Sequence, residues 1–413
     1  RGRGLGGSGR INAMIWFPPT DADWSRLAQA SGQAWSIDDL QQSFASVQTI
    51  VAPEQPTWLS DAARRFMATV TEWPDAQPIV YPRVIRAGRR WTPASLLQDC
   101  HDHPQRRRLR IVRASAQRLL FDGDDVIGVT IANGSSTESI HASEGVVVCA
   151  GAVATPALLM RSGIGPADVL AAAQIDVRCD SPAVGTGLQD HLIMPVIFRL
   201  SASARFDVQP SMPELARGQH LGGGRVTSNI AECGGLFENG RFQLHVTPTH
   251  YLTYPDPKSP AAMTLGVNVT QPESRGRVTV VAQDGRFCAQ IEPGYLSDQR
   301  DLRATVDGVR LVRCIANSQP LAGWHQGELV PSAKRQSESA IARAVARYAQ
   351  TLYHPVATCA MGIETDSVVD PSLRVRGVGR LWIADASVLP ILPQGNPNSL
   401  VMTVAHHWLD RFR

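Results

Sequence analysis

Residues 354–398 read HPVATCAMGIETDSVVDPSLRVRGVGRLWIADASVLPILPQGNPN, and the rest of the chain is best interpreted around this segment. A short apolar strand is predicted at residues 381–384, and it runs into Asp385 and a turn. His354 and Asn398 lie on irregular loops at the two ends. An imidazole can take a proton from a hydroxyl group near neutral pH, and a carboxamide can stabilise the resulting oxygen. The pair therefore suits chemistry on an alcohol, whereas a histidine in a His-Pro turn is more often structural.

Composition places the chain among ordinary globular proteins. It has 413 residues, of which 43% are hydrophobic and 19% are charged, and this length is sufficient for two domains. The formal net charge of +3 is small, and arginine supplies almost all the positive charge. No aromatic platform or recognition motif accompanies the arginine clusters, so we interpret them as solvated surface and expect no nucleic-acid partner.

The seven cysteines are scattered, odd in number and never arranged as CxxC. This pattern indicates a reducing compartment, and we expect a cytoplasmic protein. Cys100, His101 and His103 are close together, but no second ligand cluster matches them, so a polar loop is favoured over a metal site. No apolar run approaches the roughly 18 residues of a membrane span, and no signal peptide is visible, so no transmembrane segment is predicted.

The first 19 residues, RGRGLGGSGRINAMIWFPP, form a glycine-rich loop that passes directly into an apolar run. Glycine allows the backbone to approach a ligand closely and to point successive N–H groups at an anion. A flexible linker is the alternative, but we favour contact with a cofactor. Because the chain begins at Arg1 within this motif, the sequence leaves open whether the native N-terminus lies upstream.

The region before residue 195 contains both helices and strands. Helical patterns cover residues 20–48, with Ser36 as an N-cap, and residues 60–70, and a strand pair turns at Gly123. The run EGVVVCAGA (144–152) predicts a strand buried on both faces, and a helix is expected to follow with Thr155 as N-cap and Pro156 at its first position. A strand, a tight turn and a helix N-terminus can present N–H groups to a phosphate.

From residue 195 to about residue 350 the pattern changes to alternating strands followed by an amphipathic helix at 301–316. Several strands with one or two helices predict an antiparallel sheet covered on one side. The chain ends in a predicted helix at residues 399–412.

Three ordered blocks carry a family resemblance. They are GRGLGGSGRINAMIWFPP (2–19), GAVATPALLMRSGIG (151–165) followed by VGTGLQDH (184–191), and the segment from YHPVATCAMG to GNPNSLVMTV (353–404). With them the chain resembles the glucose–methanol–choline (GMC) family of FAD-dependent oxidoreductases, in particular its alcohol and choline dehydrogenase-like members. The resemblance extends over essentially the whole chain.

The resemblance implies an α/β FAD-binding Rossmann-like domain, N-terminally incomplete, and an α+β substrate domain built on an antiparallel sheet. The family's GxGxxG unit, expected well before the first block, is absent from these 413 residues. We expect residues 1–48, 105–195 and 365–413 to form the discontinuous FAD-binding domain. Residues 49–104 and 196–364 are expected to form the substrate-binding domain.

The resemblance also assigns site residues. His354 matches the catalytic base, and Asn398 matches the second active-site position. Ile11 stands where members with covalent FAD carry histidine, so non-covalent FAD is expected. The residues expected to contact FAD are Gly6, Gly7, Ser8, Asn12 and Ala13 along the diphosphate and ring, Ala116 at the adenine, Ala150 and Gly151 at the helix start, Asp385 and Ala386 near the ribityl chain and pyrophosphate, and Pro397 near the ring.

The implied function is oxidation of a primary or secondary alcohol to the carbonyl, with hydride transfer to flavin N5 and His354 as base. The partners would be a small-molecule alcohol and an acceptor that the sequence does not identify: oxygen, a quinone or a redox protein. Two alternatives stay open: an inactive fragment or binding protein lacking part of the FAD site, and a hydroxynitrile lyase-like member. Of the other histidines, His191, His406 and His407 are assigned to packing and caps, and His245 or His250 is a candidate for substrate contact.

Overall fold

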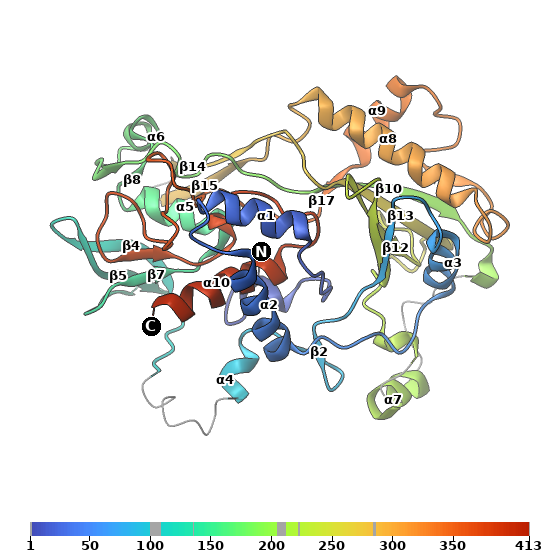
Figure 1. Cartoon of the computed structure of the whole chain (residues 1–413), viewed down its shortest axis with the longest axis horizontal. Helices are drawn as coiled ribbons and strands as arrows, with labels where there is room; N and C mark the ends of the chain where they lie inside the picture. Colours follow the sequence, from blue (N-terminus) through green and yellow to red (C-terminus); the bar gives the residue numbers. More distant parts are fainter. Residues whose placement is uncertain are drawn as a thin grey trace.

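The structure is a computed structural model that describes residues 2–99, 109–134, 136–204, 212–221, 224–283 and 286–412. Cys100, His101 and His103 lie outside these residues. Two lobes lie side by side along the long axis of the molecule (Figure 1). One lobe contains β10, β12, β13, α8 and α9, and the other contains β4, β5, β7, α5 and α6.

The largest sheet in the described part of the chain has seven strands, and every pairing in it is antiparallel. The sheet predicted for this region is therefore confirmed. Its order is β1-β11-β12-β13-β10-β16, with β17 also paired to β10. The strands are β1 (Gln77–Val80), β11 (Cys233–Phe237), β12 (Phe242–Thr247), β13 (Ala262–Val269), β10 (Leu192–Arg199), β16 (Glu328–Val330) and β17 (Gln350–Thr351).

The two faces of this sheet differ because successive side chains on a strand point in opposite directions. On β12, Phe242, Leu244 and Val246 join a buried hydrophobic cluster. Side chains of three helices complete that cluster on the same face: α3 (Asp61–Val70), α8 (Gln299–Ala316) and α9 (Glu338–Tyr348). The residues between them on β12 are polar and buried, and they face the other side.

The second lobe has a core of its own, formed by α5 (Gly151–Arg161), by the parallel pair β7 (Val146–Val148) and β18 (Leu381–Ile383), and by α10 (Asn398–Phe412). The other elements that contribute to it or lie around it are α1 (Asp21–Ala30), α2 (Ile37–Val51), β4 (Ser115–Asp122), β5 (Asp125–Asn133), β6 (Ser136–His141), β8 (Ile164–Gly165), α6 (Ala167–Ala172), β9 (Cys179–Asp180), β14 (Arg277–Gln283) and β15 (Arg286–Glu292). Val280 and Val356 also pack in this core, although both fall within the range expected for the substrate-binding domain.

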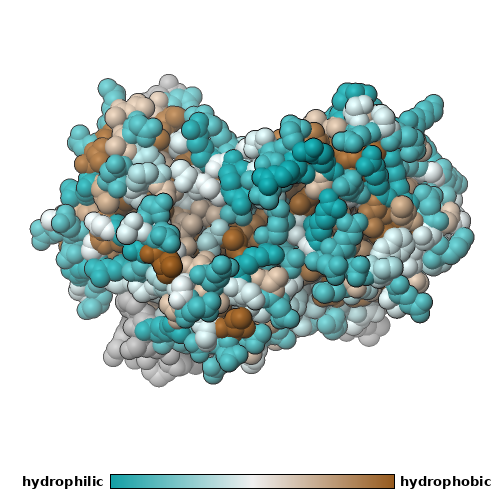
Figure 2. All heavy atoms as spheres, turned by 45° about the horizontal axis from the view of Figure 1, so that its top comes forward, coloured by the Kyte–Doolittle hydropathy of each residue, from teal (hydrophilic) through white to brown (hydrophobic). Residues whose placement is uncertain are grey.

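Smaller elements complete the described chain. They are η1 (Gly7–Arg10), β2 (Ile85–Arg86), β3 (Arg89–Arg90), α4 (Ser95–Asp99), η3 (Ala202–Ala204), α7 (Met212–Leu221), η4 (Arg225–Thr227) and η5 (Ala386–Val388). Within the described ranges, no helix is both long enough and apolar enough to cross a bilayer. The face drawn in Figure 2 is mostly hydrophilic and is hollowed between the two lobes.

Helix starts follow local chemistry closely. Ser36 caps α2 and Ser60 caps α3, because each hydroxyl accepts the backbone N–H three residues ahead. Thr20 and Asp23 form a reciprocal capping box at α1. The predictions for these helices, for the turn at Gly123 and for the helices at residues 301–316 and 399–412 are confirmed.

Helix α5 begins earlier than predicted. The sequence placed its start at Thr155, with Pro156 in the first turn, but the helix begins at Gly151 and contains Pro156 in its interior. Proline lacks an N–H group, so the carbonyl of Ala152, four residues earlier, receives no hydrogen bond from it. The Thr358 hydroxyl donates to that carbonyl at 2.7 Å instead.

Two strand predictions also need correction. The run around Val147 was expected to be buried on both faces, but the Val147 side chain is 42% exposed. Strand β6 was not predicted at all. Its sequence, STESIH, is polar and mostly exposed, so no alternating pattern marks it, and it pairs at the edge of β5.

Candidate active site

His354 lies on the loop after β17, and its side chain is only 8% exposed. Its backbone N–H donates to a carboxylate oxygen of Asp190 at 2.6 Å. The second Asp190 oxygen accepts hydrogen bonds from the hydroxyls of Thr351 and Tyr295, each at 2.5 Å. Asp190 therefore fixes the backbone at the base of the His354 side chain.

The conformation of this loop is unusual. Tyr353 and Ala357 both adopt positive φ angles, 62° and 73°, although neither is glycine. Such conformations cost about 1–3 kcal/mol each and persist only where the surroundings impose them. Gln189 contributes to these surroundings, because its backbone pairs with Val356 and its side-chain amide bonds to Pro390 and Leu392. These contacts hold the loop that carries His354 in this conformation.

Both ring nitrogens of His354 have nearby partners. Nδ1 lies 2.9 Å from Nδ1 of His191, and Nε2 lies 3.1 Å from the amide nitrogen of Asn396. His191, which was assigned to packing and caps, contacts the ring of His354 directly. Asn398 is the first residue of α10, and its catalytic role stays a prediction.

Burial affects the charge of two histidines here. Desolvation lowers the pKa of His191 to about 4 and that of His245 to about 3. Both are therefore neutral at pH 7. The imidazole beside His354 is a neutral hydrogen-bonding group and not a cation.

The polar face of β12 begins at the Asn396 side chain. The Gln243 amide nitrogen lies 3.4 Å from the Asn396 carboxamide oxygen, and His245 and Thr247 follow on the same face. Strand β13 places Asn268 opposite Gln243. Within the described part of the chain, Gln243 Oε1, His245 Nε2, Thr247 Oγ1 and Asn268 Oδ1 are buried and have no hydrogen-bond partner.

Buried polar atoms are seldom left without partners, because each costs about 1–3 kcal/mol. Four of them side by side on one face indicate a surface shaped for a polar ligand. We call Gln243, His245, Thr247 and Asn268 the polar face.

The start of α5 fits the predicted FAD. Ala150 is the N-cap residue and provides no side-chain cap, and Gly151 adopts a φ of +87° with no atom within 4 Å of an added Cβ. Open space around a glycine at a helix N-terminus allows an anionic group such as a diphosphate to approach the backbone.

Asp385 joins the end of β18 to the start of α5. One of its oxygens accepts from the Gly151 N–H at 2.8 Å and the Thr155 hydroxyl at 2.6 Å, and the other accepts from Ser387. Four protein donors thus surround the carboxylate. The predicted approach of Asp385 and Ala386 to FAD would therefore use the backbone rather than this side chain.

The N-terminal segment at residues 2–19 is held next to the C-terminal segment at residues 353–404. Asn12 Oδ1 accepts from the Met14 N–H and from Arg90, and the Ala13 carbonyl accepts from Asn229. The chain then reaches Phe17, whose carbonyl accepts from the Ser399 hydroxyl at 2.5 Å, next to Pro397 and the GNPN turn.

Gly6 is the N-cap residue of η1, and Gly7 and Ser8 are its first two residues. Ala116 lies on β4, where Arg161 of α5 donates to its carbonyl at 3.3 Å. The cofactor roles of these residues stay predictions.

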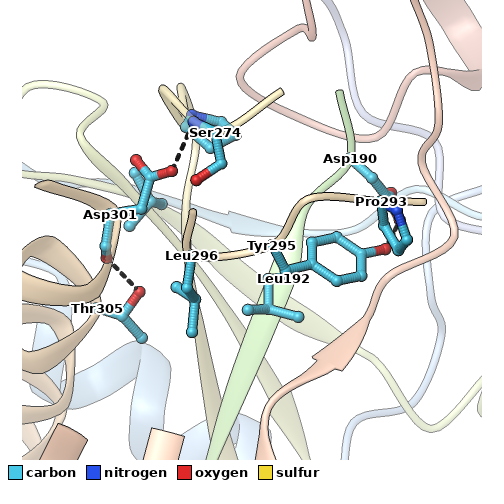
Figure 3. A pocket seen from close by; sticks show the side chains of 10 residues that line it. Asp190, Leu192, Ser274, Pro293, Tyr295, Leu296, Asp301 and Thr305 are labelled. Atoms are coloured by element: carbon cyan, nitrogen blue, oxygen red, sulfur yellow. Dashed lines mark hydrogen bonds between the residues drawn. The ribbon is translucent and has the colours of Figure 1, made fainter. Parts of the chain in front are cut away.

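A pocket next to Asp190 is lined by residues that do not include His354 (Figure 3). Leu192, Tyr295 and Leu296 line it, together with Asp301, which accepts from the Ser274 N–H. Because the Tyr295 hydroxyl donates to Asp190, we interpret the wall of this pocket as support for that carboxylate. In the described ranges, no group of three potential metal ligands occurs, and the six described cysteines are free.

The sequence analysis missed Asp190, Asn396 and Gln243 as well as His191. Only the QDH triplet carried a signal, because two polar residues and a histidine directly precede the apolar strand LIMPVIF. Asn396 was visible in GNPN, but nothing local shows which asparagine faces His354. Gln243 alternates with buried apolar residues in a way that any half-exposed strand would share.

Comparisons with known proteins agree on one family. Models described as GMC oxidoreductase match residues 85–193 and 272–405. An uncharacterized GMC-type oxidoreductase of Mycobacterium bovis is 32% identical, over 100% of this chain and 85% of its own length. An alcohol dehydrogenase (acceptor) of Pseudomonas putida is 29% identical, over 98% of this chain and 81% of its own.

A solved structure is similar over nearly the same range. The crystal structure of pyridoxine 4-oxidase from Mesorbium loti matches with a TM-score of 0.83 and 26% identity, covering 98% of this chain and 83% of that one.

Proposed function

Because the chain belongs to the GMC oxidoreductase family of FAD-dependent alcohol dehydrogenases and oxidases, we propose that it oxidises a small alcohol to the carbonyl with His354 as the base. The observation that carries this proposal is the buried, backbone-anchored His354 between His191 and Asn396. Residues 1–48, 105–195 and 365–413 would hold FAD, and residues 49–104 and 196–364 would hold the alcohol.

The chemistry requires one proton transfer from the substrate. Nε2 of His354 would accept the hydroxyl proton after the hydroxyl replaces the Asn396 amide nitrogen as its hydrogen-bond donor. Asn396, and Asn398 as predicted, would stabilise the charge of the alkoxide oxygen through amide N–H groups. Non-covalent FAD, when bound, supplies the hydride acceptor at flavin N5.

Binding of FAD would use the backbone. The backbone at the start of α5, at Ala150 and Gly151, would lie against the diphosphate, and the segment containing Gly6, Gly7 and Ser8 would lie along it. Asp385 would keep the α5 start aligned with the loop that carries Ala386.

The polar face favours an alcohol with more than one polar group. Tyr81 donates its hydroxyl hydrogen to the Leu244 carbonyl, so His245 Nδ1, 3.2 Å away, donates to the phenol oxygen and His245 Nε2 is an acceptor. Gln243 Oε1 and Asn268 Oδ1 are acceptors as well. Three acceptors without partners suit a substrate with additional hydroxyl or ammonium donors, such as a diol or polyol.

The test is anaerobic reduction of the flavin by a panel of alcohols. The loss of the visible absorbance of the flavin measures the reduction. We expect His354→Ala to slow reduction by about 10²-fold or more while FAD content is unchanged, since a general base contributes 10²–10⁴-fold. His141→Ala is the matched control, because His141 is exposed on β6.

Equal reduction rates in His354→Ala and the parent would remove His354 from the mechanism. Retention of FAD without reduction by any alcohol would instead favour the binding-protein or lyase-like alternative.

A further inference from the structure

A line of hydrogen-bonding groups crosses the site behind the proposed base. Nε2 of His191 lies 3.0 Å from the Thr270 carbonyl, and Nδ1 of His191 lies 2.9 Å from Nδ1 of His354. Nε2 of His354 then meets Asn396 at 3.1 Å. His191 is fully buried, so its ring is shielded from bulk water.

The ring hydrogens of His191 and His354 can be assigned by starting from the Thr270 carbonyl. A carbonyl oxygen only accepts, so His191 must carry its hydrogen on Nε2 to bond with Thr270. His191 is neutral because burial lowers its pKa, and its Nδ1 therefore carries a lone pair. His354 Nδ1 must then donate, which leaves the lone pair of His354 on Nε2. The Asn396 amide, which donates from its nitrogen, agrees with that assignment.

The Thr270 carbonyl, which accepts from His191, is held in place by its own contacts. Thr270 is 1% exposed, its N–H donates to the Arg241 carbonyl and its hydroxyl donates to the Gly240 carbonyl at 2.6 Å. The His191 carbonyl accepts from the Leu352 N–H, two residues before His354, so the two histidines are held by the same pairing between β10 and β17.

We propose that His191 is a positioning residue that fixes the tautomer of His354, holding the hydrogen on Nδ1 so that Nε2 is the basic atom. His191 acts only through His354. When the hydroxyl proton of an alcohol moves to Nε2, its oxygen becomes an alkoxide and His354 becomes an imidazolium whose Nδ1 hydrogen stays bonded to His191. The catalytic consequence of this inference rests on the proposed function. The tautomer of His354 does not depend on that function.

The first experiment reads the tautomer directly. Nitrogen-15-labelled histidine in the full chain is examined by long-range proton–nitrogen correlation at about pH 8, above the ordinary histidine pKa. The His354→Ala spectrum identifies the His354 signals by their loss. We expect a protonated Nδ1 and an unprotonated Nε2. A protonated Nε2 in the parent protein overturns the proposal, whatever the variants do.

The second experiment uses a matched pair of variants. His191→Asn places an amide oxygen near the position of Nδ1 and keeps an acceptor for His354, whereas His191→Leu of similar size removes it. We expect the Leu variant to lose the single tautomer and to reduce flavin about 10- to 10²-fold more slowly, with most of the loss restored in the Asn variant. Circular dichroism and FAD content identify a variant that fails to fold.

An unchanged His354 tautomer in a folded Leu variant contradicts the proposal and leaves His191 a packing residue. Equal loss in the Leu and Asn variants contradicts it as well. If the His354 tautomer depends on His191 but His354→Ala reduces flavin at the full rate, His191 positions His354 as proposed. The same result shows that His354 is not the base. The two failures are therefore distinguishable.

Discussion

Thr247 and Thr264 lie opposite each other on β12 and β13, yet their hydroxyl groups differ in one respect. Thr264 donates to the Thr249 carbonyl at 2.7 Å, whereas the buried Thr247 hydroxyl has no partner among the described residues. A hydroxyl kept in such a position lowers the stability of the protein unless a ligand satisfies it.

We therefore expect Thr247→Val to raise the free energy of unfolding by about 1 kcal/mol and to raise the KM for a diol or polyol, with kcat near that of the parent. Thr264→Val is the matched control, and it should lower the free energy of unfolding by about 1–3 kcal/mol. Urea titration and steady-state kinetics measure the two effects. If Thr247→Val destabilises the protein as much as Thr264→Val, Thr247 has a structural role and the polar face loses one of its four residues.

At this scale the sequence predicted His354 but not its neighbours. The residue types in the His-Pro turn and in GNPN were readable, but the partner of His354 depends on how the GNPN turn is oriented. That orientation comes from distant contacts, because the Gln394 N–H donates to Asp23 and the Thr20 hydroxyl bonds to the Gln394 side chain. No local pattern encodes them.

Helix α5 shows how one element depends on another. Proline inside a helix costs about 3 kcal/mol or more, partly because a carbonyl loses its donor. In α5 the carbonyl of Ala152 is buried, and the hydroxyl of Thr358 takes the place of the missing N–H. The sequence analysis placed Pro156 in the first turn because it considered only local preference, and the supporting hydroxyl lies far away along the chain.

We expect Thr358→Val to lower the free energy of unfolding by about 1–3 kcal/mol, since it leaves a buried carbonyl without a donor. Thr358→Ser keeps the hydroxyl and should cost less than half as much. Chemical denaturation measures both, and FAD affinity reports whether the α5 start has moved. A Val variant that is no less stable than the Ser variant would show that the hydrogen bond from Thr358 is not its main contribution.

Strands were predictable where one face is apolar and the other polar, as in β12, and not where both faces are polar, as in β6. The cap at Ser36 was readable because its hydroxyl and the N–H that it caps lie within one turn, whereas the cap predicted at Thr155 was wrong. Val147 was misread because an apolar run does not reveal which of its faces neighbouring elements cover.

The whole molecule carries buried neutral histidines that should make its stability depend on pH. For His191 and His245 the folded pKa lies below the ordinary value, so the unfolded chain binds more protons between about pH 6.5 and about pH 4. Stability is therefore complete above that window and is lost as the pH falls through it. Asp23 acts in the opposite direction, because burial raises its pKa.

We expect His245→Gln to reduce the loss of unfolding free energy between pH 7 and pH 5 by about 2 kcal/mol relative to the parent, because one histidine contributes about 1.4 kcal/mol per pH unit. Urea titrations of both proteins at the two pH values give this difference. His141→Gln, at an exposed position, should leave the loss unchanged. Parallel pH dependence in His245→Gln and the parent would show that His245 titrates normally in the folded state.

The alternation along β12 also has a practical use in directed evolution. Positions 243, 245 and 247 form one face of that strand, and Phe242, Leu244 and Val246 form the other. A combinatorial library confined to the three odd-numbered positions would vary the surface next to Asn396 while leaving the hydrophobic packing against α8 untouched. Most members of such a library should therefore fold, and screening them would report changes in substrate preference rather than loss of folding.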